Sequence, residues 1–142
     1  MDYKELMCGD YVKAILPTET VIVKVLGVCE DYINYEVVYS GVRATDQINP
    51  DLIVGIPVNS YALVLNGFDK QGDLYQYHID AGDGYIRVDL TDLGGGEWMY
   101  DIDVYDKFND SHNIRHNDST FLKLHQLQHL LRDCEISKEI TT

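Results

Sequence analysis

Two histidines near the C-terminal end, His125 and His129, have the spacing that most suggests chemistry in this sequence. Residues four apart lie on one face of a helix, and two imidazoles placed in this way can bind a divalent metal ion. A zinc-protease signature needs Glu directly after the first histidine, where this chain has Gln126. Asp133, one turn further on, is a possible third ligand. The pair is a candidate metal site; the alternative is an ordinary helix face.

The three cysteines provide no recognisable nucleophile. Cys8, Cys29 and Cys134 are odd in number and widely spaced, which indicates a reducing compartment rather than a disulfide framework. Cys8 and Cys134 have apolar neighbours and are expected to pack, while Glu30 and Asp31 after Cys29 oppose thiolate formation. The chain also has no Gly-x-Ser-x-Gly elbow and no Walker-type phosphate loop. The sequence therefore predicts neither an enzyme nor a cofactor.

The charge is strongly negative, at −13. Residues 73–110 contain ten carboxylates against only Arg87 and Lys107. Such a charge opposes binding to nucleic acid or to an anionic membrane surface, because both depend on Lys and Arg. A basic protein partner is compatible with it, and solubility alone would also explain it.

Residues 74–105 show the cleanest pattern, alternating with period two, and predict a three-stranded antiparallel meander. Hairpin turns are expected at residues 81–84 and 94–96. One face then carries apolar residues, with Trp98 in the core. The opposite face is a candidate interaction face, on which carboxylates accompany an aromatic and a basic side chain: Asp89, Glu97, Asp101, Asp103, Tyr85 and Arg87. The chain has 11 Tyr, which suit half-buried strands and contact surfaces alike.

Residues 5–58 predict a small, partly closed β-barrel of the SH3-like type. Short strands are expected at 20–28, 32–39, 42–48 and 52–58, separated by tight turns such as 49–51. Pro57 favours an edge position for the last strand. With 142 residues the chain suits one domain, residues 1–142, with sub-modules 5–58 and 59–142.

The remaining elements are two helices and a loop. A short helix is expected after Asn59 or Ser60, with an apolar stripe of Tyr61, Leu63, Val64 and Leu65, ending at residues 66–67 with Phe68 packing back. Residues 106–118 read as a polar loop, so the i, i+4 spacing of His112 and His116 carries no weight there. An amphipathic helix is expected from residue 118 or 119, with one apolar face: Phe121, Leu124, Leu127, Leu130, Leu131 and Cys134. Residues 137–142 should fray. The fold class expected is α+β.

The chain shows no sign of export or membrane insertion. Its first six residues lack the basic start and apolar core of a signal peptide. The longest apolar stretch, residues 21–28, is interrupted by Lys24 and is too short to cross a bilayer. A cytoplasmic location follows as an expectation.

Three segments, residues 4–12, 56–68 and 124–140, resemble a family of small uncharacterised proteins that occur in prophages and mobile elements of gut anaerobic bacteria. The resemblance touches both ends and the middle of the chain, although each motif is short. It implies an accessory gene of a mobile element and brings no activity or catalytic residues with it. The His-x-Leu-Gln-His helix resembles a signature of that family.

Three functions remain open at the level of sequence. The first is a non-enzymatic acidic accessory protein that binds a host or phage protein through the candidate interaction face. The second is a DNA mimic that inhibits a nucleic-acid enzyme, because carboxylates along a strand can imitate phosphates electrostatically. The third is a metal-binding protein, or a small metal-dependent enzyme, that uses His125 and His129. A small-molecule binding module at the barrel mouth cannot be separated from the first.

Overall fold

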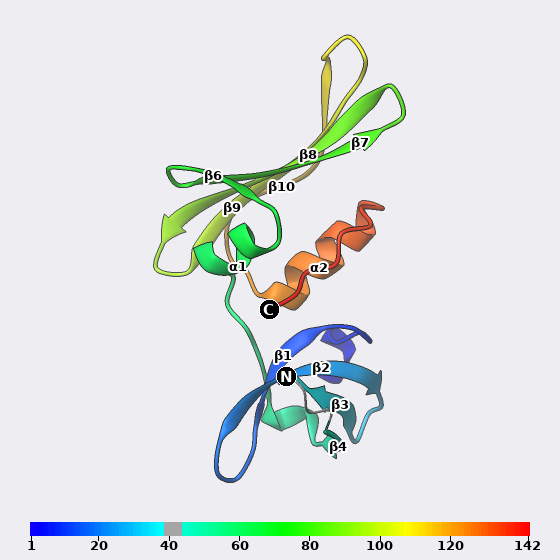
Figure 1. Ribbon diagram of the computed structural model, residues 1–142, viewed down its shortest axis with the longest axis vertical. Helices are drawn as coiled ribbons and strands as arrows, with labels where there is room; N and C mark the ends of the chain where they lie inside the picture. The colour runs from blue at the N-terminus through cyan, green and yellow to red at the C-terminus, as the bar shows by residue number, and fades with distance from the viewer. Residues whose placement is uncertain (39–43) are drawn as a thin grey trace. The chain divides into compact units, whose positions relative to one another are not determined.

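A computed structural model describes residues 1–38 and 44–142 (Figure 1). The chain forms two compact units. The first consists of Met1–Ile56 with Lys123–His129, and the second of Pro57–Leu122 with Leu130–Thr142. The expected sub-modules placed residues 123–129 with the second half of the chain, whereas they pack in the first unit. The single domain of residues 1–142 stays a prediction.

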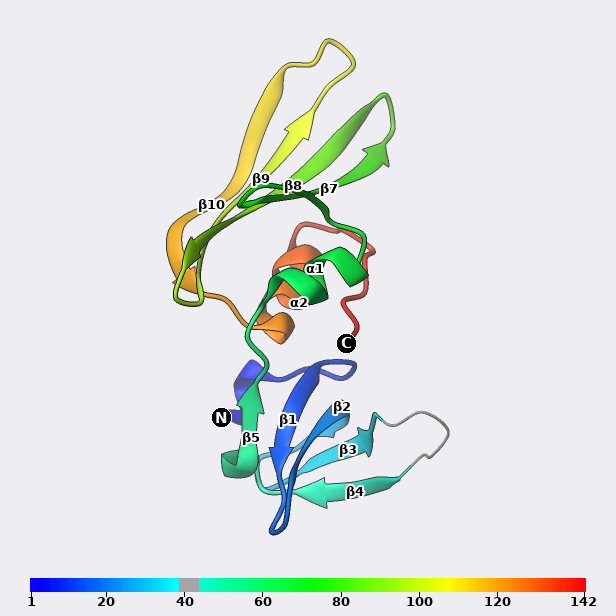
Figure 2. The same cartoon turned by 60° about the vertical axis from the view of Figure 1, so that its left-hand side comes forward.

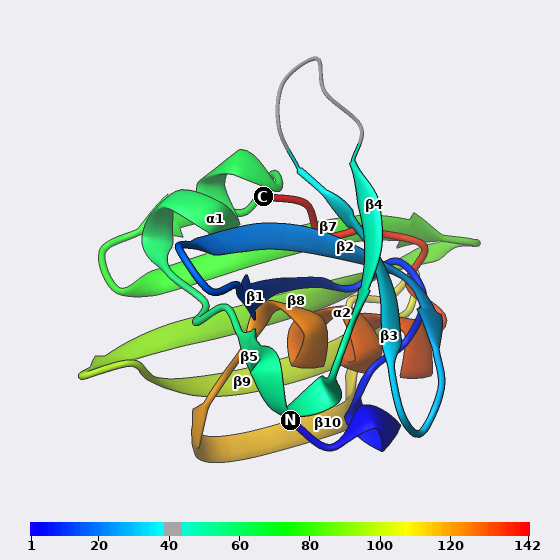
Figure 3. The same cartoon turned by 90° about the horizontal axis from the view of Figure 1, so that it is seen from below.

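The first unit is an open antiparallel sheet in the order β4-β3-β2-β1-β5 (Figure 3). Its elements are η1 Tyr3–Glu5, β1 Tyr11–Ile15, β2 Thr20–Val28, β3 Ile33–Val37, β4 Thr45–Ile48, η2 Pro50–Leu52 and β5 Ile53–Gly55. The expected strand at 20–28 and the edge position of the last strand are confirmed. The break expected between the strands at 32–39 and 42–48 lies outside the described residues.

The SH3-like barrel is not confirmed. The two edge strands, β4 and β5, are four and three residues long, and neither pairs with the other to close the sheet within the described chain. A barrel needs hydrogen bonds all the way round, which such short edges do not supply. The core comes from alternate residues, as in Val21, Val23 and Val25 of β2, which are all buried.

The second unit contains a five-stranded antiparallel sheet in the order β10-β9-β8-β7-β6 (Figure 2). Its elements are α1 Ser60–Leu65, β6 Asp69–Gln71, β7 Leu74–Ala81, β8 Gly84–Gly94, β9 Glu97–Tyr105 and β10 Ser111–Phe121. The expected meander is confirmed as β7, β8 and β9, with its turns at the expected positions. With helices beside two sheets, the α+β class is also consistent with the structure.

Strand β10 replaces the loop expected at residues 106–118. It pairs with β9 along its length, with register shifts between Asn113 and Arg115 and between Asn117 and Thr120. These irregularities break the period-two pattern, and most residues of this edge strand are exposed. The helix expected from residue 118 or 119 therefore begins only at Leu124, as α2 Leu124–Asp133.

Helix α1 has the expected ends but a different apolar face. The Asn59 side chain accepts a hydrogen bond from the Ala62 backbone N–H at 2.9 Å, and Gly67 follows the helix with φ 88°. Of the expected stripe only Leu63 is buried, whereas Tyr61 is 77% exposed and Val64 and Leu65 are also exposed. Only one side of this six-residue helix is buried, and Ala62 and Leu63 lie on that side. Phe68 is buried, as expected.

Helix α2 divides between the units, its first six residues belonging to the first. Leu124, Leu127 and Leu131 are buried as expected, but Phe121 is an exposed residue of β10. The tail that was expected to fray, residues 137–142, makes contacts in the second unit, where the Thr141 backbone hydrogen-bonds to Asn66. Ile140 is buried in the second unit.

Candidate interaction face

The second sheet has one apolar face and one polar face. Val88, Leu90, Trp98 and Ile102 are at most 2% exposed and point to the apolar side. Tyr75 and Tyr77 share that side and contact the elements that pack on it: the Tyr75 hydroxyl meets Ser60 of α1 at 2.6 Å, and the Tyr77 ring meets Phe68. The opposite side, which we call the outer face, carries the half-buried residues Tyr85, Arg87, Asp89, Glu97, Asp101 and Asp103.

Strand pairing brings five of these six residues together. In the β8–β9 register, Arg87 lies opposite Asp103, and Asp89 lies opposite Asp101. Tyr85 lies opposite Tyr105. Residues directly opposite each other on one face are close enough for their side chains to interact. Glu97 is separate, at the start of β9.

The carboxylates are held by donors on neighbouring strands. Asp89 accepts hydrogen bonds from the Gln76 amide on β7 and from the Arg87 Nε, both at 3.0 Å. The amide of Asn113 on β10 donates to Asp101 at 3.3 Å and to Asp103 at 3.0 Å. These carboxylates therefore have fixed positions while remaining partly open to solvent.

His116 on β10 lies between two carboxylates. Its Nδ1 is 2.6 Å from Asp101 Oδ1, and its Nε2 is 2.6 Å from Asp118 Oδ1. The hydrogen bonds to Asp101 and then to Asp118 raise the pKa of His116 above its ordinary value. In the sequence, His116 is notable only for its i, i+4 spacing from His112, which carries no weight in an expected loop. The pairing of β10 with β9 places His116 on the outer face.

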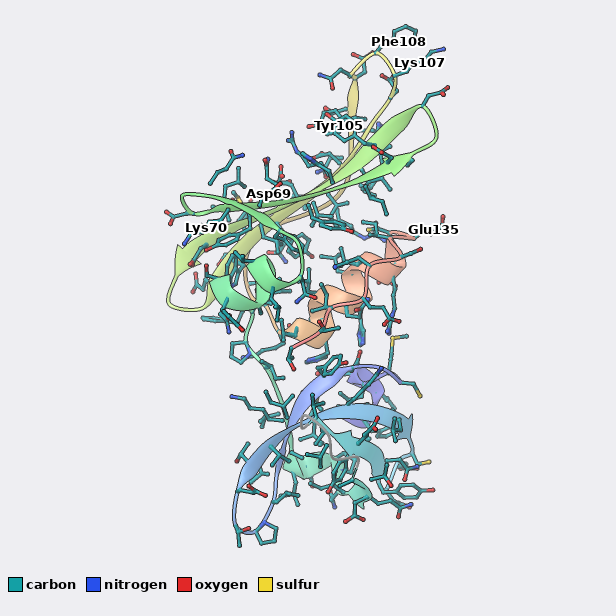
Figure 4. The ribbon with its side chains drawn as sticks, in the orientation of Figure 1. Asp69, Lys70, Tyr105, Lys107, Phe108 and Glu135 are labelled. Carbon is teal, nitrogen blue, oxygen red and sulfur yellow. The ribbon has the colours of Figure 1, made fainter. Side chains whose placement is uncertain are left out.

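An aromatic cluster ends the outer face beside the β9–β10 hairpin, whose tip carries Lys107 and Phe108 (Figure 4). The Tyr85 and Tyr105 rings stack with centroids 4.6 Å apart and planes within 5°. The Arg87 guanidinium lies 5.0 Å from the Tyr105 centroid. Because Arg87 also binds Asp89, it connects the aromatic cluster to the carboxylates.

The histidines first considered for metal binding lie elsewhere, in the first unit. His125 is 2% exposed, and neither of its ring nitrogens has a hydrogen-bond partner among the described residues. His129 Nε2 lies 2.8 Å from Asp10 Oδ2, whose side chain is fully buried. Among residues 1–38 and 44–142, no three side chains of the ligand-forming types come together as a metal site would require. The i, i+4 pair thus lacks a third ligand there.

Asp10 precedes strand β1 and is 1% exposed. Its carboxylate also accepts the Met7 backbone N–H at 2.7 Å, so it anchors both the turn and His129. Beside it, burial lowers the pKa of His125, although the nearby Asp10 carboxylate opposes this. The His125 ring packs closely against Gly55 of β5. A Cβ at position 55 would lie only 3.0 Å from the His125 ring, so glycine leaves room for this contact. This cluster reads as the anchor of α2 on the first sheet.

The cysteines offer no reactive cluster. Cys8 is exposed, contrary to expectation, with its thiol 3.2 Å from the Leu26 carbonyl. Burial raises the pKa of Cys134, which favours its protonated thiol.

In the described parts of the chain, neither helix has the length and apolar character needed to cross a membrane. No family model, curated protein or solved structure matches this chain.

Proposed function

We propose that this protein is a non-enzymatic interaction protein that binds a basic protein surface through the outer face of the second sheet. One observation carries the proposal: the register of β8 and β9 places Asp89, Asp101 and Asp103 side by side on a face that no element of the second unit covers among the described residues. Strands are stiff supports, so a partner meets charges already in position.

The chemistry of the face fits a cationic partner. Five carboxylates, at Asp89, Glu97, Asp101, Asp103 and Asp118, outnumber one guanidinium and the two imidazoles of His78 and His116. The net charge of the whole chain, −13, adds long-range attraction for a positively charged protein. The hydrogen bonds that hold the carboxylates reduce the conformational entropy that binding would otherwise cost. The stacked tyrosines supply apolar contact area beside them.

The outer face fits a protein surface better than it fits imitation of DNA. A phosphate backbone is an uninterrupted row of negative charges, whereas Arg87 and His116 stand between the carboxylates of this face. Inhibition of a nucleic-acid enzyme stays the second candidate, as a special case of a basic partner. The metal-binding alternative has no comparable support, because His125 and His129 lack a third ligand in the described chain.

The cellular setting belongs to the proposal. An accessory protein of a mobile element, acting in the cytoplasm on a host or phage protein, fits a small acidic chain with free cysteines. For the first unit, we keep the SH3-like description as a proposal, supported by its strand order and by the short η2 turn before β5.

A charge-matched pair of variants tests the proposed function. In the first, Asp89, Asp101 and Asp103 are changed to Asn; in the second, Asp2, Asp31 and Asp51 of the first unit are changed to Asn, so that both lose the same charge. Each is used with the wild-type protein in a tagged pull-down from host lysate at low and high salt. Circular dichroism checks that all three are folded.

We expect a basic protein that the wild type and the first-unit variant retain at low salt and release at high salt, and that the outer-face variant fails to retain. Equal retention by both variants would refute the role of the outer face. If total charge alone determined capture, both variants would retain less of the basic protein to the same extent. That result would also refute the role of the outer face.

A further inference from the structure

His116 differs from the other donors of the outer face because its charge changes with pH. Both of its ring nitrogens lie 2.6 Å from carboxylate oxygens, one on β9 and one on β10. Two carboxylates can both accept only if each ring nitrogen carries a proton, so the geometry is that of an imidazolium. Gln76, Asn113 and Ser119, which hold the other carboxylates, stay neutral.

The charged side chains nearest the His116 ring come from strands β9 and β10. On β9, Asp101 contacts the ring directly, and the Asn113 amide donates to both Asp101 and Asp103. On β10, Asp118 contacts the ring, while the neighbouring Arg115 directs its guanidinium to the Ile114 carbonyl. On these two strands, carboxylates thus surround His116.

We propose that His116 is a pH switch for the outer face: protonated, it clamps Asp101 and Asp118 and weakens the face for a basic partner, and its deprotonation strengthens binding. The inference rests on the proposed function, because it concerns regulation of that same surface. Loss of the proton removes one positive charge from among the five carboxylates and removes a donor from at least one of the two carboxylates.

The direction of the pH effect on affinity follows from the charge of His116. With rising pH, His116 releases its proton to solvent, the face becomes one unit more negative, and a cationic partner binds more tightly. The raised pKa of His116 moves this change to a higher pH than for an unperturbed histidine. At low salt, one exposed charge should change the affinity roughly two- to fivefold, and salt should reduce the effect.

The first experiment observes His116 directly. NMR titration of the imidazole signals in the wild type is compared with an Asp101→Asn, Asp118→Asn double variant. We expect the His116 titration midpoint to be lower in the double variant, because both hydrogen-bonded carboxylates have lost their charge. Equal midpoints would overturn the switch.

The second experiment measures binding of a short oligoarginine peptide, whose charge does not titrate, at about pH 5.5 and about pH 9. His116→Asn represents the neutral state, His116→Lys the fixed charge, and His112→Asn, at an exposed site on the same strand, is the matched control. Two-dimensional NMR spectra verify that each variant is folded.

The switch requires that the wild type and His112→Asn bind more tightly at the higher pH. It also requires that this gain is lost in His116→Asn, which should bind tightly throughout, and in His116→Lys, which should bind weakly throughout. The same pH response in wild type and His116→Asn overturns the switch while leaving the proposed function in place. No binding by the wild type at either pH overturns both.

Discussion

Trp98 tests the assignment of the two faces of the second sheet at the scale of one residue. It is 2% exposed, and its ring meets Tyr75 edge-on with centroids 5.5 Å apart. Changing Trp98→Ala should lower the free energy of unfolding by roughly 3–5 kcal/mol, because the cavity cannot fully collapse. Urea unfolding followed by circular dichroism measures this, with the exposed Phe108→Ala as the control that should change little. A Trp98→Ala protein as stable as the wild type would contradict the assignment of Trp98 to the buried face.

His125 makes the stability of the first unit depend on pH. Burial lowers its folded-state pKa below the unfolded value of about 6.5, so the unfolded chain binds the proton first as pH falls. The His125 contribution is therefore complete above about pH 6.5 and is lost as pH falls from there toward the lowered folded-state pKa. Chemical denaturation at several pH values should show a smaller loss on acidification for His125→Met. Identical acid sensitivity in both proteins would exclude His125 as the source.

Residue roles could be predicted where period two holds. The alternation along β8 and β9 placed Tyr85, Arg87 and Asp89 on one face and Trp98 on the other, and burial confirms both faces. Asp10 and His116 could not be recognised in the same way. Each gains its partner from a segment distant in sequence, and such a contact leaves no local pattern.

At the scale of elements, Asn66 joins α1 to the end of the chain. Its side-chain amide donates to the Ala62 carbonyl at 2.7 Å and to the Thr141 carbonyl at 2.8 Å, and its carbonyl accepts from the Thr141 N–H at 2.9 Å. Since Asn66 is 3% exposed, these groups have little access to water.

Asn66→Ala should therefore cost about 1–3 kcal/mol of stability, because it leaves buried backbone groups unpaired. Hydrogen exchange should become faster at residues 137–142 in this variant. Asn117→Ala, on β10, is the control in which the tail should stay protected. A tail that exchanges rapidly even in the wild type would contradict the anchoring.

The elements themselves were predictable to different degrees. The strand at 20–28, the meander and the ends of α1 follow from local composition and turn residues. Strand β10 does not, because its bulges and polar edge residues resemble a loop, and its backbone partners on β9 decide its structure. The same reason explains the late start of α2.

At the scale of the whole molecule, charge and architecture act together. Two units each form their own sheet, and the carboxylates of residues 73–110 belong to the second. Net charge could be read from the sequence, but its concentration on one face of a sheet required the register of β8, β9 and β10. The membership of residues 123–129 in the first unit also depends on contacts distant in sequence.

The central claim is that the outer face of the second sheet binds a basic partner. Chemical-shift mapping of the isotope-labelled protein with a short oligoarginine peptide at low salt tests it most directly. We predict that the largest changes follow β8, β9 and β10 around Asp89, Asp101 and Asp103, and that they disappear at high salt. Changes spread evenly over acidic residues of both units, or centred on the first unit, would contradict the account.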